Sequence, residues 1–444
     1  MIIDNEQLPE GYQQTEVRII PEDWSVKSLG EICIKIQDGN YGGDYPKSHE
    51  FLSYGIPFLT SKVLGKDGSL KEDRIDFISH DKHARLDKAH LQLNDVLFTN
   101  RGASVGAIGF VNEKISNGNI GPQLTLLRAD EKVILSIFLY YIMRSATVTK
   151  QISGQDSGSA MNFFSIGATE KFKIPFPLNR EEQRSIAQAL SDVDALIAAL
   201  DKAIAKKRHL KTATMQQLLT GKKRLPGFGE GKGYQKTEIG TIPEDWNVKH
   251  LKDALKTNPR YGINAAAVPY RDSLPIYIRI TDISEAGYFA PESLVSVNQE
   301  NSDQYYLEEG DLVFARTGAS VGKSYLYNPN DGKLVFAGFL IRIRPNENIL
   351  LPDYLSQYVR TKAYWDWVQL MSMRSGQPGI NGNEYGQLLV PFPDMKEQRA
   401  IATVLSDMDA EIAALETRRA KTQALKQGMM QQLLTGKVRL KIEV

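Results

Sequence analysis

The residues that could bind a phosphate or catalyse a reaction are few, and the most suggestive group is Gly318–Ser324, which reads GASVGKS. A phosphate-binding loop needs four residues between its glycines, so that successive backbone N–H groups curl round the phosphates. Here only three residues separate the glycines, and the related segment Gly102–Ile108, GASVGAI, has no lysine. We therefore expect a tight glycine turn between strands. A stand-alone nucleotide-dependent or nuclease enzyme built around GASVGKS is kept as the alternative hypothesis.

Three other groups resemble parts of enzyme sites but lack essential members. Asn258–Tyr261, NPRY, approaches the catalytic tetrad of amino-methyltransferases, with Arg in place of the second proline and without a glycine-rich cofactor motif. Pro352-Asp353 with Asp394–Lys396 weakly resembles a nuclease metal site, but it is absent from the first half of the chain. The third group is a set of histidines in charged surroundings, which favour a solvated face over a metal site: His80, His83 and His90. The sequence predicts no catalytic residue and no metal ligand.

The elements that must position any site come in two copies, because the chain contains a tandem repeat. Gly11–Trp24 returns as Gly233–Trp246 with 10 of 14 residues identical, and Glu181–Asp201 returns as Lys396–Glu416 with 14 of 21 identical. The segment MQQLLTGKKRL, which begins at Met215, also recurs with a single change. A repeat of this length is too long for a solenoid. Each copy is therefore expected to be a domain followed by an appendage.

The appendage is predicted to be a long helix with a coiled-coil seam, because its apolar residues step alternately by four and three. The seam consists of Ile186, Leu190, Val193, Ile197, Leu200 and Ile204 in the first copy, and of Ile401, Leu405, Met408, Ile412 and Leu415 in the second. A core helix packed on its own domain is the alternative, but two similar long seams can bury each other. We expect an antiparallel pair related by a pseudo-twofold axis, with helices that begin after the Pro-Phe-Pro triplets and end at Gly221 and Gly436.

The predicted fold class is α+β, with two similar globular domains and two long antiparallel coiled-coil helices. The domains are expected at residues 1–178 and 226–394, and the spacer helices at 179–225 and 395–444. Both domains contain short β-like runs separated by Gly, Pro and Asn, followed by an aromatic-rich helical stretch. The two stretches are Ile134–Ile152 and Pro352–Met371.

Length and composition exclude several classes of protein. At 444 residues the chain is too long for one ordinary core. A formal net charge of +1, from 54 basic and 53 acidic residues, excludes a protein that coats nucleic acid by bulk charge. The single cysteine, Cys33, excludes an internal disulfide and a Cys-rich zinc module, and it favours a reducing compartment. With no signal-like start and no long apolar run, we expect a cytoplasmic protein with no membrane contact.

Local charge is more informative than net charge. From Lys202 to Arg224 there are eight Lys or Arg and no Asp or Glu, and from Thr417 to Lys441 there are seven and none. These cations either complement the negative carboxyl ends of the helices on a solvated face, or they contact an acidic partner or the DNA backbone. The sequence favours neither interpretation.

Polar turns in the two domains supply candidate DNA-binding residues. They combine guanidinium groups with small hydroxyls, amides and backbone donors, which suits base edges and phosphates. An ordinary surface ion pair is the alternative for each arginine. The candidates are Asn100, Arg101, Ser104, Gln155 and Ser157 in the first repeat, and Arg316, Thr317, Ser320, Arg374 and Gln377 in the second.

The order of these parts resembles the specificity subunit of type I restriction-modification enzymes. The resemblance spans essentially the whole chain, and it rests on EEQRSIAQALSDVDALI from Glu181, on the QQLLTG endings at Gln216 and Gln431, and on the GASVG turns. It implies that each domain is a target-recognition domain for one half of a bipartite DNA site, and that the helices form a spacer that docks methyltransferase subunits. The two copies differ where Asn100-Arg101 in the first stands against Arg316-Thr317 in the second.

The resemblance also implies a non-catalytic chain without a cofactor of its own. Its partners would be double-stranded DNA, two modification subunits that carry S-adenosylmethionine, and restriction subunits that use ATP and Mg. Two like domains related by a pseudo-dyad should meet DNA as a dimeric repressor does, with half-sites about one helical turn apart. Because their polar loops differ, we expect an asymmetric, interrupted site. A coiled-coil scaffold with no DNA role is the remaining alternative.

Overall fold

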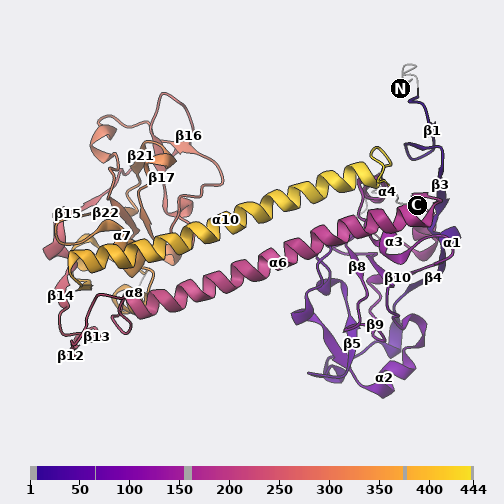
Figure 1. Ribbon diagram of the computed structural model, residues 1–444, viewed down its shortest axis with the longest axis horizontal. Helices are drawn as coiled ribbons and strands as arrows, with labels where there is room; N and C mark the ends of the chain where they lie inside the picture. The colour runs from indigo at the N-terminus through magenta and orange to yellow at the C-terminus, as the bar shows by residue number, and fades with distance from the viewer. Residues whose placement is uncertain (1–7, 66, 155–162, 374–377, 442–444) are drawn as a thin grey trace. The chain divides into compact units, whose positions relative to one another are not determined.

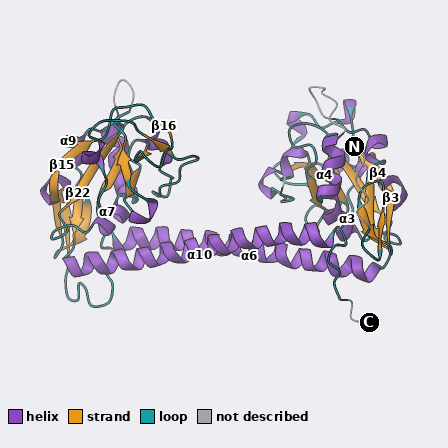
Figure 2. Cartoon of the chain, turned by 90° about the horizontal axis from the view of Figure 1, so that it is seen from above, coloured by secondary structure: helices purple, strands orange, loops and turns teal. Residues whose placement is uncertain are grey.

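The computed structural model describes residues 8–65, 67–154, 163–373 and 378–441. The chain forms two compact units, of which unit 1 consists of Met1–Asp201 with Arg418–Val444 and unit 2 of Lys202–Thr417. Each unit contains one globular domain and part of each long helix, α6 (Arg180–Leu218) and α10 (Met395–Leu433) (Figures 1 and 2). In the part of the chain that is described, no helix is both long and apolar enough to cross a bilayer.

Unit 1 is an α+β domain built on a four-stranded antiparallel sheet in the order β4-β10-β7-β8. A three-stranded sheet, β6-β5-β9, and the pairs β1-β2 and β11-β3 complete it. The strands are β1 (Tyr12–Gln14), β2 (Ile19–Pro21), β3 (Trp24–Ser28), β4 (Cys33–Asp38), β5 (Ile56–Leu59), β6 (Asp76–Ile78), β7 (Val96–Thr99), β8 (Ile108–Phe110), β9 (Asn119–Ile120), β10 (Leu124–Ala129) and β11 (Lys173–Pro177). The short helices are α1 (Leu29–Ile32), α2 (His80–Arg85), α3 (Ser136–Met143), α4 (Ala146–Gly154) and α5 (Ile166–Thr169).

Unit 2 repeats this plan with a sheet in the order β15-β22-β19-β20 and the pairs β12-β13 and β14-β23. Its second sheet has four strands, β16-β18-β17-β21. The strands are β12 (Tyr234–Thr237), β13 (Gly240–Pro243), β14 (Asn247–His250), β15 (Leu255–Tyr261), β16 (Val268–Pro269), β17 (Ile276–Ile278), β18 (Val295–Ser296), β19 (Leu312–Ala315), β20 (Ser324–Leu326), β21 (Leu334–Phe336), β22 (Leu340–Pro345) and β23 (Leu389–Phe392). The short helices are α7 (Pro352–Tyr358), α8 (Lys362–Ser372) and α9 (Gly382–Gly386). The predicted α+β class and its duplication are confirmed.

The GASVG segments are the turns of two equivalent β-hairpins. In unit 1 the turn joins β7 to β8, and in unit 2 it joins β19 to β20. Gly102 and Gly106 have φ of +88° and +86°, and Gly318 and Gly322 have +72° and +90°. Glycine adopts this left-handed region without the steric cost that a Cβ atom brings. The expected tight glycine turn is therefore confirmed.

The two aromatic-rich stretches are each divided into two helices. The break falls after Arg144 in unit 1, between α3 and α4, and after Arg360 in unit 2, between α7 and α8. The hydroxyl of Thr361 accepts a hydrogen bond from the Tyr364 N–H and so starts a new helix. The aromatic faces are domain core, because Phe138, Tyr141 and Tyr364 lie among the fully buried side chains.

The long helices begin three (α6) and two (α10) residues beyond their Pro-Phe-Pro triplets, and both end three residues before a glycine. Gly221 and Gly436 have φ of +68° and +69°. A Cβ atom would lie 2.3 Å from Pro243 Cδ at Gly221 and 2.4 Å from Pro21 Cγ at Gly436. Both the left-handed backbone and the close proline therefore require glycine where the chain leaves each helix.

The seam residues predicted from the sequence lie on the inner faces of the helices. Most are at most 8% exposed, and the others are half-buried rather than exposed. The buried members are Ile186, Leu190, Leu200, Ile204, Ile401, Leu405 and Ile412. The half-buried members are Val193, Ile197, Met408 and Leu415. In each unit the helix pair also joins the domain core, as Leu433 and Leu434 do in unit 1.

Within unit 1, the start of α6 runs antiparallel to the end of α10. Lys426 Nζ lies 2.5 Å from Asp194 Oδ1, and Arg419 Nε lies 2.6 Å from Asp201 Oδ1. Earlier residues of α6 therefore lie beside later residues of α10, as in an antiparallel pair. The Tyr141 hydroxyl donates to Asp194 as well, at 2.9 Å, which ties α3 to the helix pair.

Within unit 2, the end of α6 is paired with the start of α10 in the same way. Lys211 Nζ lies 2.6 Å from Asp409 Oδ1, and Lys207 Nζ lies 2.5 Å from Glu411 Oε2. Burial lowers the pKa of the Lys211 ammonium, and the bond to Asp409 opposes that shift. Several of the basic residues whose role the sequence left open therefore face the acidic first half of the other helix.

A second charge contact joins the segment after each helix to the start of the other. In unit 1, Arg439 binds Asp23 at 2.6 Å and the buried Glu182 at 2.5 Å. Arg224 makes the equivalent contacts in unit 2, with Asp245 at 2.9 Å and with Glu397 at 2.5 Å. The arginine hydrogen bonds hold the pKa values of both aspartates below their usual range. We call these two contacts the arginine clamps.

The seam should contribute to stability through packing rather than propensity. We expect Leu190→Ala to lower the free energy of unfolding by about 3 kcal/mol, because Leu190 is fully buried and its removal leaves a cavity. Leu196, on the same helix and 39% exposed, provides the control. Leu196→Ala should lower the free energy of unfolding by less than about 1 kcal/mol. Urea unfolding followed by tryptophan fluorescence measures both. Equal effects of the two changes would contradict this account of the seam.

The arginine clamps should matter more than exposed ion pairs. Glu397→Gln should cost about 3 kcal/mol, because it leaves Arg224 without its buried partner. Glu411→Gln removes a carboxylate whose side chain is 56% exposed, and it should cost less than about 1 kcal/mol. The measurement is the urea midpoint of each variant at low and high salt. A Glu397→Gln protein as stable as Glu411→Gln would show that the clamp does not stabilise unit 2.

Candidate nucleic-acid interface

Two candidate residues of the first repeat, Asn100 and Arg101, directly follow β7, and Asn100 is internal. Asn100 is fully buried, so its predicted role as a DNA contact is wrong. Its amide Nδ2 donates to Asp38 Oδ1 at 3.0 Å, to the hydroxyl of Thr125 at 3.0 Å and to the carbonyl of Pro122 at 3.2 Å. A buried amide is stable only with such partners, and here they leave no donor for a base.

The buried carboxylate of Asp38 organises this end of the sheet. It accepts from Thr125 Oγ1 at 2.6 Å and, through its other oxygen, from the Tyr41 hydroxyl at 3.0 Å. The Tyr41 hydroxyl in turn accepts from Nη2 of Arg101. Burial, followed by the nearby Asp38 charge, raises the pKa of Tyr41. The phenol is therefore held in its donor form between the carboxylate and the guanidinium.

Arg101 is held in place on several sides. Its guanidinium carbon lies 5.1 Å from the ring centre of Tyr41 and 4.8 Å from that of Phe163. Its Nε donates to Asn100 Oδ1 at 3.3 Å. These contacts occupy Nε and part of Nη2, and they leave the outer edge of the guanidinium for a ligand. Both aromatic rings are about half exposed, so the group lies at the surface.

The strand ladders identify the equivalent positions in unit 2. Thr125 pairs with Asp38 across β10 and β4, and Ile341 pairs with Tyr261 across β22 and β15. The backbone N–H groups of Phe164 and Ile380 donate to the carbonyls of Asn100 and Arg316, each at 2.9 Å. The hydrogen-bonded group Asp38, Asn100 and Thr125 in unit 1 thus corresponds to Tyr261, Arg316 and Ile341 in unit 2.

The chemistry at these equivalent positions is different. In unit 2 the guanidinium carbon of Arg316 lies 5.1 Å from the ring centre of Tyr261. The buried Nε of Arg316 has no hydrogen-bond acceptor among the described residues. Unlike the Tyr41 hydroxyl, the Tyr261 hydroxyl accepts no hydrogen bond from the stacked arginine within the described part of the chain, and it instead accepts one from the Gly382 N–H at 3.0 Å. Unit 2 therefore presents a stacked cation where unit 1 has an uncharged amide.

The remaining candidates fall into two groups. Ser104, Thr317 and Ser320 are half-buried residues of the two hairpin turns. The other four, Gln155, Ser157, Arg374 and Gln377, lie outside the described residues.

The lysine of GASVGKS, Lys323, pairs with Glu285 at 2.5 Å, and the GAS part of that segment is a short 3₁₀ turn.

Sequence reasoning missed the aromatic partners of the two arginines. These partners are distant in sequence from the turns they support, and none belongs to a repeated motif: Tyr41, Phe163 and Tyr261. The sequence signal that could have found them is the presence of aromatic residues outside the predicted helices and core strands.

The histidine group makes its contacts within the protein. The His83 and His90 rings stack at 4.0 Å, and His83 Nδ1 lies 2.5 Å from Asn119 Oδ1.

Comparison with known proteins agrees with this geometry. The family model described as the type I restriction modification DNA specificity domain matches residues 21–207 and 243–426. The putative type I restriction enzyme MjaX specificity subunit of Methanocaldococcus jannaschii is 27% identical over 97% of both chains. The EcoKI specificity subunit of Escherichia coli K12 is 23% identical over 89% of this chain and 84% of its own.

Two solved structures share the fold. A crystal structure of the type I restriction-modification system S subunit from M. genitalium aligns with a TM-score of 0.58 at 14% identity, over 96% of this chain and 97% of that one. A chain from a structural study of complex assembly and conformational transition in the type I R-M system aligns with a TM-score of 0.54 at 18% identity, over 94% and 99%. Because the family model covers both repeats, the chain belongs to the family of type I restriction-modification DNA specificity subunits.

Proposed function

We propose that this chain reads a bipartite, asymmetric DNA site for a type I restriction-modification complex, with one half-site for each globular domain. The observation that carries the proposal is the pair of equivalent turns that present Arg101 and Arg316 on exposed aromatic rings. Arginine is the commonest reader of guanine in the major groove and also a strong phosphate ligand. One backbone plan with different side chains at these positions supports unlike half-sites.

In this role the chain itself catalyses no reaction and carries no cofactor. The modification subunits would bring S-adenosylmethionine, and the restriction subunits would bring ATP and Mg. We infer that two modification subunits dock on the paired helices, and that the complex works in the cytoplasm, where the DNA lies. Support for partner docking comes from the relatives, which are named as subunits of type I restriction enzymes.

Arg101 is proposed to recognise a guanine through its outer edge. With Nε and part of Nη2 occupied, Nη1 and the second Nη2 hydrogen can donate together to the O6 and N7 acceptors of guanine. The ring of Tyr41 fixes the plane of the fork, and its hydroxyl fixes the rotation. Tyr41 is therefore a positioning residue. Asn100 supports it from below and does not contact DNA.

Replacement of Arg101 should alter recognition at one base pair of one half-site. We expect Arg101→Lys to reduce the preference for the cognate base about 10-fold, because lysine keeps the charge but lacks the two-pronged fork. Tyr41→Phe should have a smaller effect in the same direction. The measurement is the rate of methylation of site variants by the assembled complex. Arg85→Lys, at an exposed position on α2, is the control. Unchanged base preference in Arg101→Lys would refute the assignment.

The helices are proposed to set the separation of the half-sites. Four extra residues between Ala205 and Thr214, with four more at the equivalent place between Ala420 and Met429, add about 6 Å of helix. We expect the unspecified gap in the DNA target to lengthen by about two base pairs. Sequencing of methylated sites in cells that carry the complex measures the gap. A stable, active complex with the original gap would refute the spacer role.

A further inference from the structure

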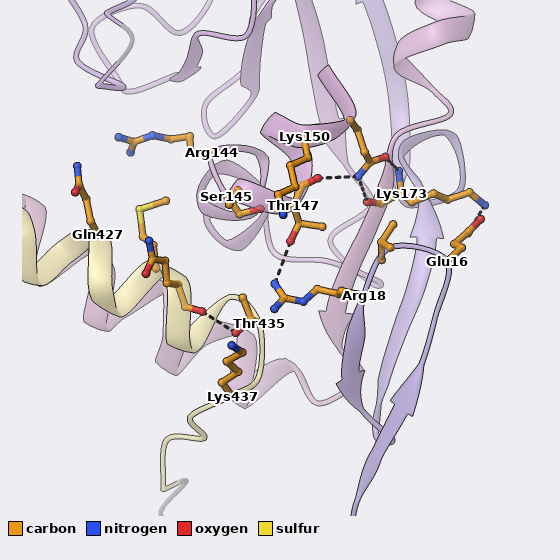
Figure 3. A pocket seen from close by; sticks show the side chains of 15 residues that line it. Glu16, Arg18, Arg144, Ser145, Thr147, Lys150, Lys173, Gln427, Thr435 and Lys437 are labelled. Carbon is orange, nitrogen blue, oxygen red and sulfur yellow. Dashed lines mark hydrogen bonds and ion pairs between the residues drawn. The ribbon is translucent and has the colours of Figure 1, made fainter. Parts of the chain in front are cut away.

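Unit 1 contains a hollow of about 750 Å³ between its domain and the end of α10. Figure 3 shows its walls, which come from the β1–β2 turn, the start of α4, the first residue of β11 and the last turn of α10 with the residues after it. Five cations line it, namely Arg18, Arg144, Lys150, Lys173 and Lys437. A single carboxylate, Glu16, lies among them, 3.1 Å from Lys173. The hollow therefore carries a strong excess of positive charge.

Arg18 is a half-buried cation without a counter-charge. Its Nη1 donates to the Thr147 hydroxyl at 3.1 Å, and its Nε donates to the carbonyl of Ile19 at 3.4 Å. Among the described residues no carboxylate pairs with it, and burial lowers its pKa. Partial burial of a guanidinium on neutral acceptors alone is unfavourable. An anion that enters the hollow would compensate for this loss of solvation.

The other cations leave charge free for such an anion. Arg144 donates to the Tyr140 hydroxyl at 2.7 Å and to the carbonyl of Asp67, which are both neutral groups, and its charge also interacts with the Asp67 carboxylate. Lys150 and Lys437 are exposed and form no ion pair with a described residue. In Figure 3, Arg18 and Lys437 lie on different walls, one on the domain and one after the helix.

The second repeat loses three of the four cations on the domain wall of the hollow and keeps the fourth, because Arg144 corresponds to Arg360. The positions equivalent to Arg18, Lys150 and Lys173 are Gly240, Asp366 and Leu389. The equivalence follows from structure as well as sequence, since Thr15 Oγ1 donates to the carbonyl of Arg18 at 2.6 Å and Thr237 Oγ1 donates to that of Gly240 at 2.8 Å. The helix wall is largely kept, because Met430, Gln431, Thr435 and Lys437 correspond to Met215, Gln216, Thr220 and Lys222, and only Gln427 is replaced, by Thr212.

We propose that this hollow binds a carboxylate-rich segment of a protein that assembles with the chain, and that it makes unit 1 the tighter of two docking places for that protein. The second clause rests on the proposed function, in which two copies of a modification subunit dock on the paired helices. The shared helix wall would serve both copies, and Arg18, Lys150 and Lys173 of unit 1 would add attraction for only one.

The charge pattern favours a protein segment over the DNA backbone. A duplex read by both domains would meet equivalent surfaces of both repeats, but Arg18, Lys150 and Lys173 have no basic equivalent in the second repeat. The walls also contain apolar side chains, Val17 and Met430, and the amides Gln427 and Gln431. This mixture is typical of protein interfaces, in which charged groups surround apolar contact. Attraction of this kind weakens as salt rises.

The first test uses the full chain and a fluorescein-labelled oligoglutamate peptide as the probe. The variant Arg18→Gly/Lys150→Asp places the second repeat's residues in the hollow, and we expect it to bind the peptide at least about 10-fold more weakly. Lys132→Glu, at an exposed lysine of unit 1 outside the hollow, is the control and should bind nearly as the unchanged protein does. Lys150→Asp alone changes an exposed residue and should weaken peptide binding by a smaller factor. This single variant replaces the double variant in the assay if the double variant folds poorly.

Competition in the same assay separates the peptide from other anions. Excess random-sequence duplex and sodium tripolyphosphate should displace the probe no better than sodium chloride of equal ionic strength. Displacement by duplex that is lost in the double variant would show a DNA-backbone site and overturn the proposal. Specific displacement by tripolyphosphate would show a phosphate site and overturn it equally.

The second test follows assembly with the purified modification subunit by native mass spectrometry across a salt series. The proposal expects two binding steps, of which the tighter becomes weaker in Arg18→Gly/Lys150→Asp until the two are alike. Two equal steps in the unchanged protein would overturn it. The methylated site sequence of the variant complex is read in parallel. An unchanged site with equalised docking supports both proposals. Docking that stays unequal in the variant would overturn this one, whereas a complex of the unchanged protein that methylates DNA without sequence preference would contradict the proposed function alone.

Discussion

The structure depends on opposite charge that crosses between the two long helices. Each helix is acidic in its first half and basic in its second, so only an antiparallel pairing brings unlike charges together. The least exposed cations of this pattern, Lys426 and Lys211, pair with the half-buried Asp194 and Asp409 where the domains join the helices. Because a buried charge without its partner is strongly unfavourable, these pairs specify the register of the helices more than they add net stability.

The same helix starts also hold the domains. Gln183 accepts from the Leu135 N–H at 2.8 Å and donates to the carbonyl of Pro177 at 2.8 Å, and Gln398 makes the matching bonds to Leu351 and Pro393. Adjacent residues of the same helix turn, Glu182 and Glu397, receive the arginine clamps. A short Glu-Gln motif therefore fixes both the partner helix and the domain, which explains why it is present in both repeats.

The repeat, the seam and the glycine turns could be predicted from the sequence because each depends on local spacing. The seam follows from a periodicity of apolar residues, and the turns from glycines that recur at one position. The role of Asn100 could not be predicted, because its partner Asp38 lies 62 residues away and its direction depends on sheet register. The clamps were hidden for the same reason. The charge division of the helices was visible, and it would have predicted their antiparallel pairing independently.

The composition of unit 1 has a consequence for the order in which the protein is made. Its core closes with Leu433 and Leu434, which are made only after the whole second domain. Until Leu433 and Leu434 are made, the apolar side of the first domain and the seam around Leu190 cannot pack against the end of α10. Nascent chains expose such surface to aggregation and to chaperones. Translation must therefore pass through the second domain and reach Leu434 before the first domain can mature, whereas unit 2 is drawn from the continuous segment Lys202–Thr417.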